Sequence, residues 1–298
     1  MARTLKIAAA QYPLSELADI AAYEAKIARW VEEAAKEGAE LLVFPEYGAM
    51  ELATIGAKGR DLRLSMTAVS DLIAELDRVH AGLAARHGVT IVAGSAPQHR
   101  HGRVFNTAHI FGPGGKMGAY DKIMPTPGER QQMKIAGGRP LTVFKTGKAT
   151  IGLLICYDIE FPLLSRALAE GGADVILAPS CTETEWGYWR VRTGAMARAL
   201  ENQVYTVHAP LVGEAPFCAV CPQNAGAAGI FAPSDRGFPP GGVVALGEMN
   251  RPQWVYADVD LDLLADVREE GMVQTYRHWP EQPGAARLPA PSIVNLAG

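Results

Sequence analysis

The chain has 298 residues and a formal net charge of −4, with 28 basic and 32 acidic side chains. Hydrophobic residues make up 48% and charged residues 20%, which excludes wholesale disorder and allows a core that needs no disulfide or metal. The mild negative charge argues against a nucleic-acid partner, and no run of roughly 18 apolar residues indicates a membrane span.

Hydrophobic periodicity predicts strands and helices that alternate along the chain. Compact apolar runs predict strands at 6–11, 41–44, 89–93, 150–155, 175–178, 204–208, 227–231 and 253–259. Apolar residues at helical spacing predict helices over 17–38, 69–87, 162–171 and 188–200. The segments 107–111 and 116–120 flank a glycine-rich turn, a pattern typical of a β-hairpin.

The C-terminal segment from 279 to 298 contains Pro280, Pro283, Pro289 and Pro291, and we expect it to run as an extended arm. Residues 1–278 are interpreted as a single domain. The start of the chain has no apolar stretch and cleavage site typical of a signal peptide. Four cysteines are too few for a disulfide scaffold in a chain of this size. We therefore expect a reduced, cytoplasmic protein.

Three reactive side chains follow predicted strands, where α/β folds place their functional groups. Glu46 comes after the predicted strand 41–44, Lys122 follows the predicted hairpin, and Cys156 directly follows the predicted strand 150–155. A free thiol with a pKa near about 8.5 is mostly protonated at neutral pH. A carboxylate can take that proton, and an ammonium can stabilise the negative charge that forms. Taken singly, each residue is as well explained by a core, turn or surface position.

Sequence motifs around these residues share the order and spacing of a known family. Glu46 and Lys122 are 122 − 46 = 76 positions apart, and Lys122 and Cys156 are 156 − 122 = 34 apart. Over nearly its whole length the chain resembles the nitrilase superfamily, the carbon–nitrogen hydrolases. The motifs are Ala8-Ala9-Ala10-Gln11, Phe44-Pro45-Glu46-Tyr47, Tyr120-Asp121-Lys122-Ile123-Met124-Pro125 with Gly128-Glu129, Ile155-Cys156-Tyr157-Asp158-Ile159-Glu160-Phe161-Pro162, the stretch 172–180 and the stretch 198–203.

The resemblance implies an α/β fold, a four-layer α-β-β-α sandwich of two stacked sheets with helices outside. It also implies a Glu-Lys-Cys triad with a second glutamate. Carried onto this chain, Glu46 would be the general base, Lys122 the oxyanion stabiliser and Cys156 the nucleophile, while Glu129 would orient Lys122 or the substrate amine. This chemistry needs no metal or organic cofactor. The resemblance further implies a homodimer or a multiple of dimers.

The residues after the nucleophile bear on the bond that is cut. Nitrile-hydrolysing members commonly carry Trp-Glu there, whereas this chain has Tyr157-Asp158, which favours an amide substrate. We expect a small carboxamide to be hydrolysed to carboxylate and ammonia through a thioester on Cys156. A nitrilase or an N-carbamoyl amidohydrolase with the same triad is the alternative.

Residues near these motifs are predicted to bind the substrate. They are Tyr47, Tyr157, Cys181, Thr182 and Trp186. An aromatic wall suits a flat or apolar acyl group, although such rings also fill cores and subunit interfaces. Arg190 and Arg192 are either carboxylate-binding groups or helix-surface charges.

Cys218-Ala219-Val220-Cys221 has the C-x-x-C spacing of a redox pair or of half a zinc site. No second such pair or His-x-x-x-His motif completes a zinc site, so no metal is predicted. There are two alternatives from other functional classes. One is a thiol redox sensor that uses Cys218 and Cys221, and the other is a catalytically idle scaffold. The presence of Glu46, Lys122, Glu129 and Cys156 together argues against the scaffold.

Overall fold

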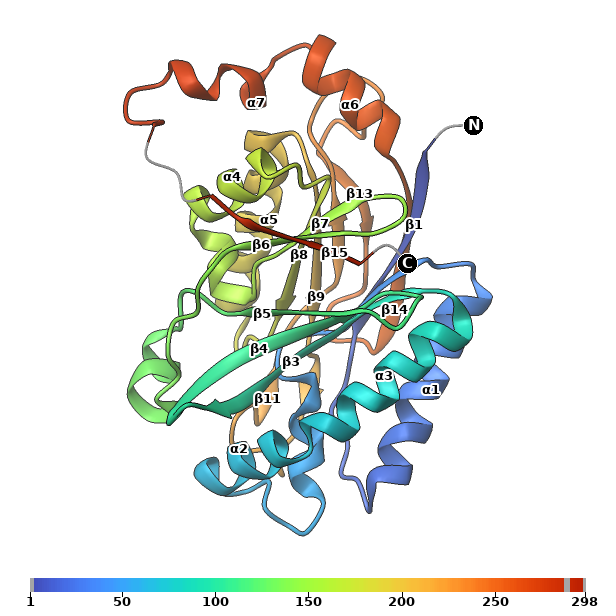
Figure 1. The fold of residues 1–298 in the computed structure, drawn as a ribbon, viewed down its shortest axis with the longest axis vertical. Coiled ribbons are helices and arrows are strands. Elements are labelled where there is room, and N and C mark those ends of the chain that lie inside the picture. Colours follow the sequence, from blue (N-terminus) through green and yellow to red (C-terminus); the bar gives the residue numbers. More distant parts are fainter. Residues whose placement is uncertain (1–2, 287–289, 297–298) are drawn as a thin grey trace.

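The computed structural model describes residues 3–286 and 290–296, and its centre is a pair of large β-sheets (Figure 1). The first sheet has six strands and the second has seven. In spatial order the first comprises β14 (Gln253–Asp260), β1 (Thr4–Gln11), β2 (Leu41–Val43), β3 (Thr90–Arg100), β4 (Arg103–Phe111) and β5 (Met117–Asp121). The second comprises β13 (Val243–Leu246), β12 (Gly229–Phe231), β9 (Tyr205–Pro210), β8 (Val175–Ser180), β7 (Thr150–Leu153), β6 (Thr142–Lys145) and β15 (Ser292–Asn295).

Helices cover the outer faces of the two sheets (Figure 1). The α-helices are α1 (Ile20–Lys36), α2 (Leu62–Asp71), α3 (Ile73–His87), α4 (Pro162–Glu170), α5 (Glu185–Asn202), α6 (Leu261–Glu270) and α7 (Thr275–His278). Short helical turns are η1 (Gly48–Thr54), η2 (Glu129–Met133), η3 (Cys156–Glu160) and η4 (Trp279–Glu281), and β10 (Gly213–Glu214) pairs with β11 (Gln223–Asn224). None of the helices in the described ranges is long and apolar enough to cross a membrane.

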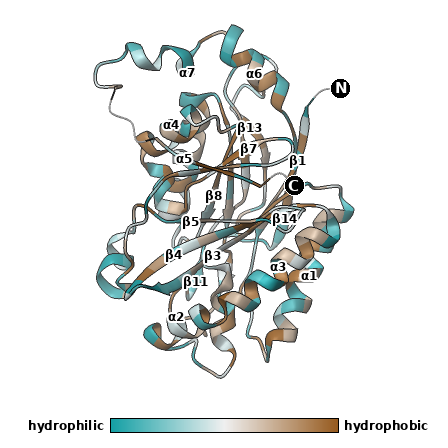
Figure 2. Ribbon diagram, in the orientation of Figure 1, coloured by the Kyte–Doolittle hydropathy of each residue, from teal (hydrophilic) through white to brown (hydrophobic). Residues whose placement is uncertain are grey.

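The alternation of side chains along β1 explains the layers. Ile7 belongs to the buried cluster that contains Ile151 of β7, whereas its neighbour Ala8 belongs to a second cluster with Ile27 of α1 and Leu83 of α3. Successive side chains of a strand point to opposite faces, so one face of this sheet packs on the other sheet and one on helices. Apolar residues gather along the central strands, and the helices carry hydrophilic residues (Figure 2). The four-layer sandwich implied by the resemblance is confirmed.

Most predicted elements are present with shifted ends, and the largest change concerns the predicted helix over 69–87. The structure has two helices there, α2 and α3, which meet at Leu72. Asp61 caps α2 by accepting the backbone N–H groups of Arg63 and Leu64. Polar residues in the first turns of α2 interrupt the apolar spacing, so periodicity detects the helix only from Val69 onward.

The C-terminal segment, expected from its prolines to run as an extended arm, begins with a short helical turn and later forms a strand. Pro280 lies in η4, a single turn whose start tolerates proline. Farther on, β15 pairs in parallel with β6 at the edge of the second sheet. Prolines are tolerated beside an edge strand. The described part of this segment therefore adds a strand to the sheet of its own chain.

Candidate active site

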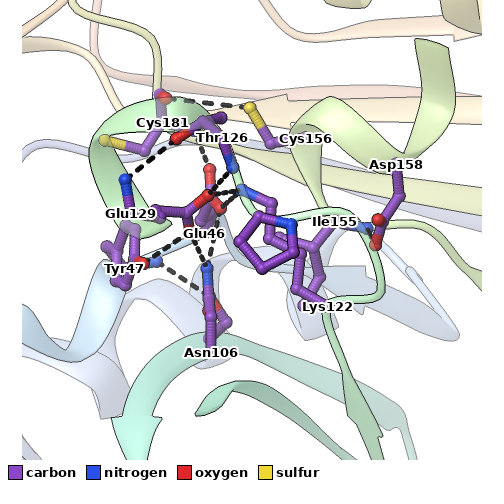
Figure 3. Close-up of polar contacts among 12 residues, drawn as sticks. Glu46, Tyr47, Asn106, Lys122, Thr126, Glu129, Ile155, Cys156, Asp158 and Cys181 are labelled. Carbon is purple, nitrogen blue, oxygen red and sulfur yellow. Dashed lines mark hydrogen bonds and ion pairs between the residues drawn. The ribbon is translucent and has the colours of Figure 1, made fainter. Parts of the chain in front are cut away.

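Cys156 lies at the turn where β7 leads into η3, and its sulfur points toward Cys181 (Figure 3). Its φ is 48°, in the left-handed region that residues other than glycine rarely adopt. Cys156 is only 5% exposed, and its Sγ donates to the carbonyl oxygen of Cys181 at 3.8 Å. The strained turn directs a buried thiol toward neighbouring polar groups.

Asp158 holds this turn in place. Its fully buried carboxylate accepts the backbone N–H of Ile155 at 3.2 Å, the N–H of Met124 at 2.7 Å and the hydroxyl of Tyr120 at 2.8 Å. These contacts join the turn at Cys156 to the segment after β5, which carries Lys122. The carboxylate therefore fixes the thiol relative to the ammonium.

Replacing Asp158 with alanine is expected to lower the free energy of unfolding by about 3 kcal/mol, because several buried donors lose their acceptor. Urea unfolding measures this loss. Asp158→Asn keeps one acceptor oxygen of the same shape and should lose less. Equal losses in the two variants, or none, would contradict the role given to the carboxylate.

Glu46 follows β2 and is 1% exposed. Its Oε1 accepts Lys122 Nζ at 2.7 Å and Asn106 Nδ2 at 2.9 Å, and its Oε2 accepts the backbone N–H of Cys181 at 2.9 Å. The Cys156 thiol is close enough for the charge of the same carboxylate to raise its pKa. Glu46 thus contacts groups from both sheets at once.

Glu129 begins η2, and all its acceptor positions are in use. Its Oε1 accepts the Tyr47 hydroxyl at 2.7 Å and Asn106 Nδ2 at 2.9 Å. Its Oε2 accepts Lys122 Nζ at 2.7 Å and the backbone N–H of Thr126 at 2.7 Å. Figure 3 shows Lys122 between Glu46 and Glu129, so the ammonium is held by two carboxylates.

The surroundings of Glu46 and Glu129 shift the pKa values of these two carboxyl groups in opposite directions. Burial raises the pKa of Glu46 to about 6, against the attraction of Lys122. Burial acts on Glu129 in the same direction, but the Lys122 ammonium and its hydrogen bond lower the pKa of that carboxyl below its ordinary value. Such a divergence is typical of acid–base sites. Glu46 can exchange a proton near neutral pH, whereas Glu129 stays ionised.

Thiol and ammonium are both protonated at rest. Burial and the negative charge of Glu46 raise the pKa of Cys156 well above its ordinary value. Burial by itself would lower the pKa of Lys122, but Glu46 and Glu129 outweigh it and raise that pKa. A thiol in this state needs a base before it can act as a nucleophile, and the Glu46 carboxylate is a neighbour that could take the proton.

A cavity of about 170 Å³ opens onto these four groups. Its other walls include Leu62, Gln132, Met133, Glu183 and Val220. A larger hollow of about 590 Å³ lies along the exposed side of α5 and contains none of the reactive groups. The chemistry assigns the candidate site to the smaller cavity.

Only some of the predicted substrate-binding residues reach this cavity. Tyr47 and Cys181 line it, while Tyr157, Thr182 and Trp186 are not among its lining residues. Tyr157 packs edge-on against a neighbouring ring, and the Thr182 hydroxyl donates to a backbone carbonyl at 2.7 Å. Trp186 lies in the first turn of α5, with 80% of its surface exposed. The aromatic wall is thus reduced to Tyr47, beside aliphatic side chains.

Sequence reasoning does not single out Asn106, although this residue bridges the carboxylates of Glu46 and Glu129. Its one Nδ2 lies 2.9 Å from both Glu46 Oε1 and Glu129 Oε1. The available signal is an amide side chain in a strand, where an asparagine is disfavoured unless its hydrogen bonds are used. The amide therefore forms a second link between the two carboxylates, beside Lys122.

Cys218 and Cys221 form a thiol pair behind the cavity wall. Both are buried, and their Sγ atoms are 3.3 Å apart. All four cysteines are free thiols. Within residues 3–286 and 290–296, no cluster of three or more His, Cys, Asp or Glu side chains has a geometry that would hold a metal ion.

Comparison with known proteins gives relatives across most of the chain. The model of the carbon–nitrogen hydrolase family matches residues 6–269. The probable hydrolase YhcX of Bacillus subtilis is 33% identical over 270 residues, 91% of this chain, and this chain spans about half (52%) of that relative. The omega-amidase NIT2 of Danio rerio is 28% identical over 255 residues, with 80% of this chain and 83% of the relative covered.

Solved structures share the fold. A carbon–nitrogen hydrolase from Helicobacter pylori matches with a TM-score of 0.74 at 18% identity, covering 93% of this chain and 94% of the other. A cysteine-to-alanine mutant of the amidase from Nesterenkonia sp. AN1, in complex with butyramide, matches with a TM-score of 0.68 at 24% identity. That match covers 92% of this chain and 97% of the other.

Fold, site and relatives together define an enzyme, a hydrolase. More narrowly, the chain belongs to the carbon–nitrogen hydrolase family, the nitrilase superfamily.

Proposed function

We propose that this protein hydrolyses a small primary carboxamide to a carboxylate and ammonia, through a thioester on Cys156. The observation that carries the proposal is the convergence of a buried thiol, the Glu46 carboxylate and the Lys122 ammonium on one cavity. These are the groups that nucleophilic acyl transfer requires, namely a nucleophile, a base and an oxyanion stabiliser.

In the first half of the proposed reaction, Glu46 takes the thiol proton as Cys156 Sγ attacks the amide carbon. Lys122 Nζ and the backbone N–H of Tyr157 stabilise the oxyanion of the tetrahedral intermediate. Collapse of the intermediate breaks the C–N bond. The protonated Glu46 gives its proton to the leaving nitrogen, so ammonia departs and the acyl group stays on sulfur.

In the second half, Glu46 takes a proton from water as the water oxygen attacks the thioester carbon. Breakage of the C–S bond releases the carboxylic acid, and the proton on Glu46 returns to the sulfur of Cys156. A base with a pKa of about 6 suits both directions of transfer. Glu129 and Asn106 act as positioning residues, since their hydrogen bonds hold Lys122 and Glu46.

The size of the cavity supports a substrate with a short acyl group. A volume of about 170 Å³ corresponds to about six water molecules at roughly 30 Å³ each. Drug-sized ligands need pockets of about 300 Å³ or more. Butyramide, the ligand of the Nesterenkonia amidase, is therefore a suitable first substrate.

Ammonia release from a panel of short amides, nitriles and N-carbamoyl amino acids tests the proposal. We expect release from butyramide that disappears in Cys156→Ala, with no release from nitriles. A carbamoylase would release carbon dioxide together with ammonia. Release from nitriles alone would contradict the amide assignment. The idle scaffold and the redox sensor both predict no release from any compound.

A homodimer in the cytoplasm stays a prediction. Large apolar side chains are exposed on the outer helical layer, with Trp186 at 80%, Trp189 at 51% and Leu163 at 52%. Clustered exposed apolar residues are typical of protein–protein contact surfaces. Light scattering at micromolar concentration should give the mass of a dimer or a multiple of it, and a monomer would contradict this prediction.

A further inference from the structure

Charge is unevenly distributed around the catalytic cavity. Three carboxylates line it, those of Glu46, Glu129 and Glu183, against a single basic side chain, that of Lys122, within the described part of the chain. Lys122 Nζ is 2.7 Å from each of Glu46 and Glu129. Its charge is therefore offset by two buried carboxylates, and Glu183 is left without a neutralising cation.

Glu183 lies in the loop between β8 and α5, at the mouth of the cavity. Its side chain makes no hydrogen bond or ion pair with any other residue that the structure describes. It also lines an adjoining cavity of about 570 Å³ together with Glu185, Trp186 and Trp189. An acidic and aromatic surface of this kind attracts cations and repels anions.

Basic residues near the site are engaged or lie elsewhere. Arg190 Nε is 3.4 Å from the Glu160 carboxylate, and the Arg192 guanidinium packs 4.9 Å from the centre of the Trp189 ring. Neither lines the catalytic cavity. Arg63 and Lys134 line a cavity that adjoins the catalytic one at Gln132 and Met133, and neither lines the catalytic cavity itself. A carboxylate on the acyl group of a substrate would thus meet Glu183 without a guanidinium to pair with it.

We infer that this enzyme selects amides whose acyl group is neutral or carries an ammonium, and rejects amides whose acyl group carries a carboxylate. Glu183 is the residue outside the reacting groups that strengthens this preference. The inference rests on the proposed function, because it names the substrate class of the same site. Like charges brought together in a binding site exclude a ligand more effectively than small changes of shape.

Three amides of similar length test the inference: butyramide is neutral, 3-aminopropanamide is cationic and succinamate is anionic. We expect kcat/KM for succinamate to be at least about tenfold below that for butyramide. The value for 3-aminopropanamide should equal or exceed that for butyramide. Succinamate turned over as well as butyramide would overturn the inference and leave the proposed function intact.

Glu183→Gln removes the charge and keeps the shape. Relative to butyramide, succinamate should improve about two- to fivefold and 3-aminopropanamide should weaken by a similar factor, the range for a partly exposed charge pair. Glu185→Gln is the matched control, since it makes the same change two residues away and outside the catalytic cavity. It should change both ratios less than Glu183→Gln does. Unchanged ratios in Glu183→Gln would overturn the role of Glu183.

Binding to the Cys156→Ala variant separates charge preference from chemistry. Calorimetry should give the same order of affinity, with succinamate weakest. This order without turnover of any amide by the unmodified enzyme would refute the proposed function and retain the charge preference. Equal affinity for the three amides, or no binding of any, would overturn the inference.

Discussion

Lys122→Met is expected to lose both activity and stability. Loss of one oxyanion donor typically lowers kcat by roughly 10²- to 10³-fold. The variant also leaves Glu46 and Glu129 buried together with Asn106 as their shared donor and no cation between them. Breaking a buried ion pair by removing one partner costs about 3–5 kcal/mol of unfolding free energy. Ammonia release and urea unfolding measure the two effects.

Another buried lysine of the same chain provides a matched control. Lys26 Nζ lies 2.6 Å from Glu51 Oε2, with side-chain exposures of 8% and 0%. Neither residue lines the catalytic cavity. Lys26→Met should lower the unfolding free energy to a similar extent but leave kcat of the folded enzyme near its original value. A comparable loss of kcat in both variants would mean that Lys122 acts only through folding.

Much of the fold follows from local patterns. The alternation at Ile7 and Ala8 reports two buried faces, because the side-chain period of a strand is two residues. Local patterns predict less where tertiary contacts determine the ends and the pairing of elements. The apolar stripe continues from α2 into α3, so its periodicity does not reveal that the helix breaks at Leu72. The pairing of β15 with β6 joins segments far apart in the chain, and no local pattern encodes it.

The residues of the site also differ in how far the sequence alone reveals them. Glu46, Lys122 and Cys156 lie in recognisable motifs, and the structure brings them together. Asn106 contacts Glu46 across 60 positions, and Asp158 contacts Met124 across 34, so their roles appear only once the chain is folded.

The substrate-binding residues show why proximity in sequence misleads. Tyr157 and Trp186 are near Cys156 and Cys181 in the chain, but η3 and the start of α5 turn them away from the cavity. Glu183 and Met133 instead form its walls from two separate segments.

Glu46→Gln removes the base while keeping its shape, and it is expected to reduce kcat/KM roughly 10²- to 10⁴-fold. In the unmodified enzyme the base must be deprotonated to act. Burial raises the pKa of Glu46 to about 6, so activity should fall as the pH drops through about 6 and hold above it. A profile of kcat/KM for butyramide against pH measures this limb. A limb near the ordinary glutamate pKa would contradict a buried Glu46 as base.

Glu129→Gln tests whether the second carboxylate tunes the first. Burial is the main reason that the pKa of Glu46 is raised, and the negative charge of Glu129 adds to it. Removal of that charge should lower the pKa of Glu46, so the acidic limb should move to lower pH even though kcat falls through the loosened hold on Lys122. A purely structural role for Glu129 would reduce stability and activity without moving the limb. A limb that stays in place or moves to higher pH would therefore reject electrostatic coupling between the two carboxylates.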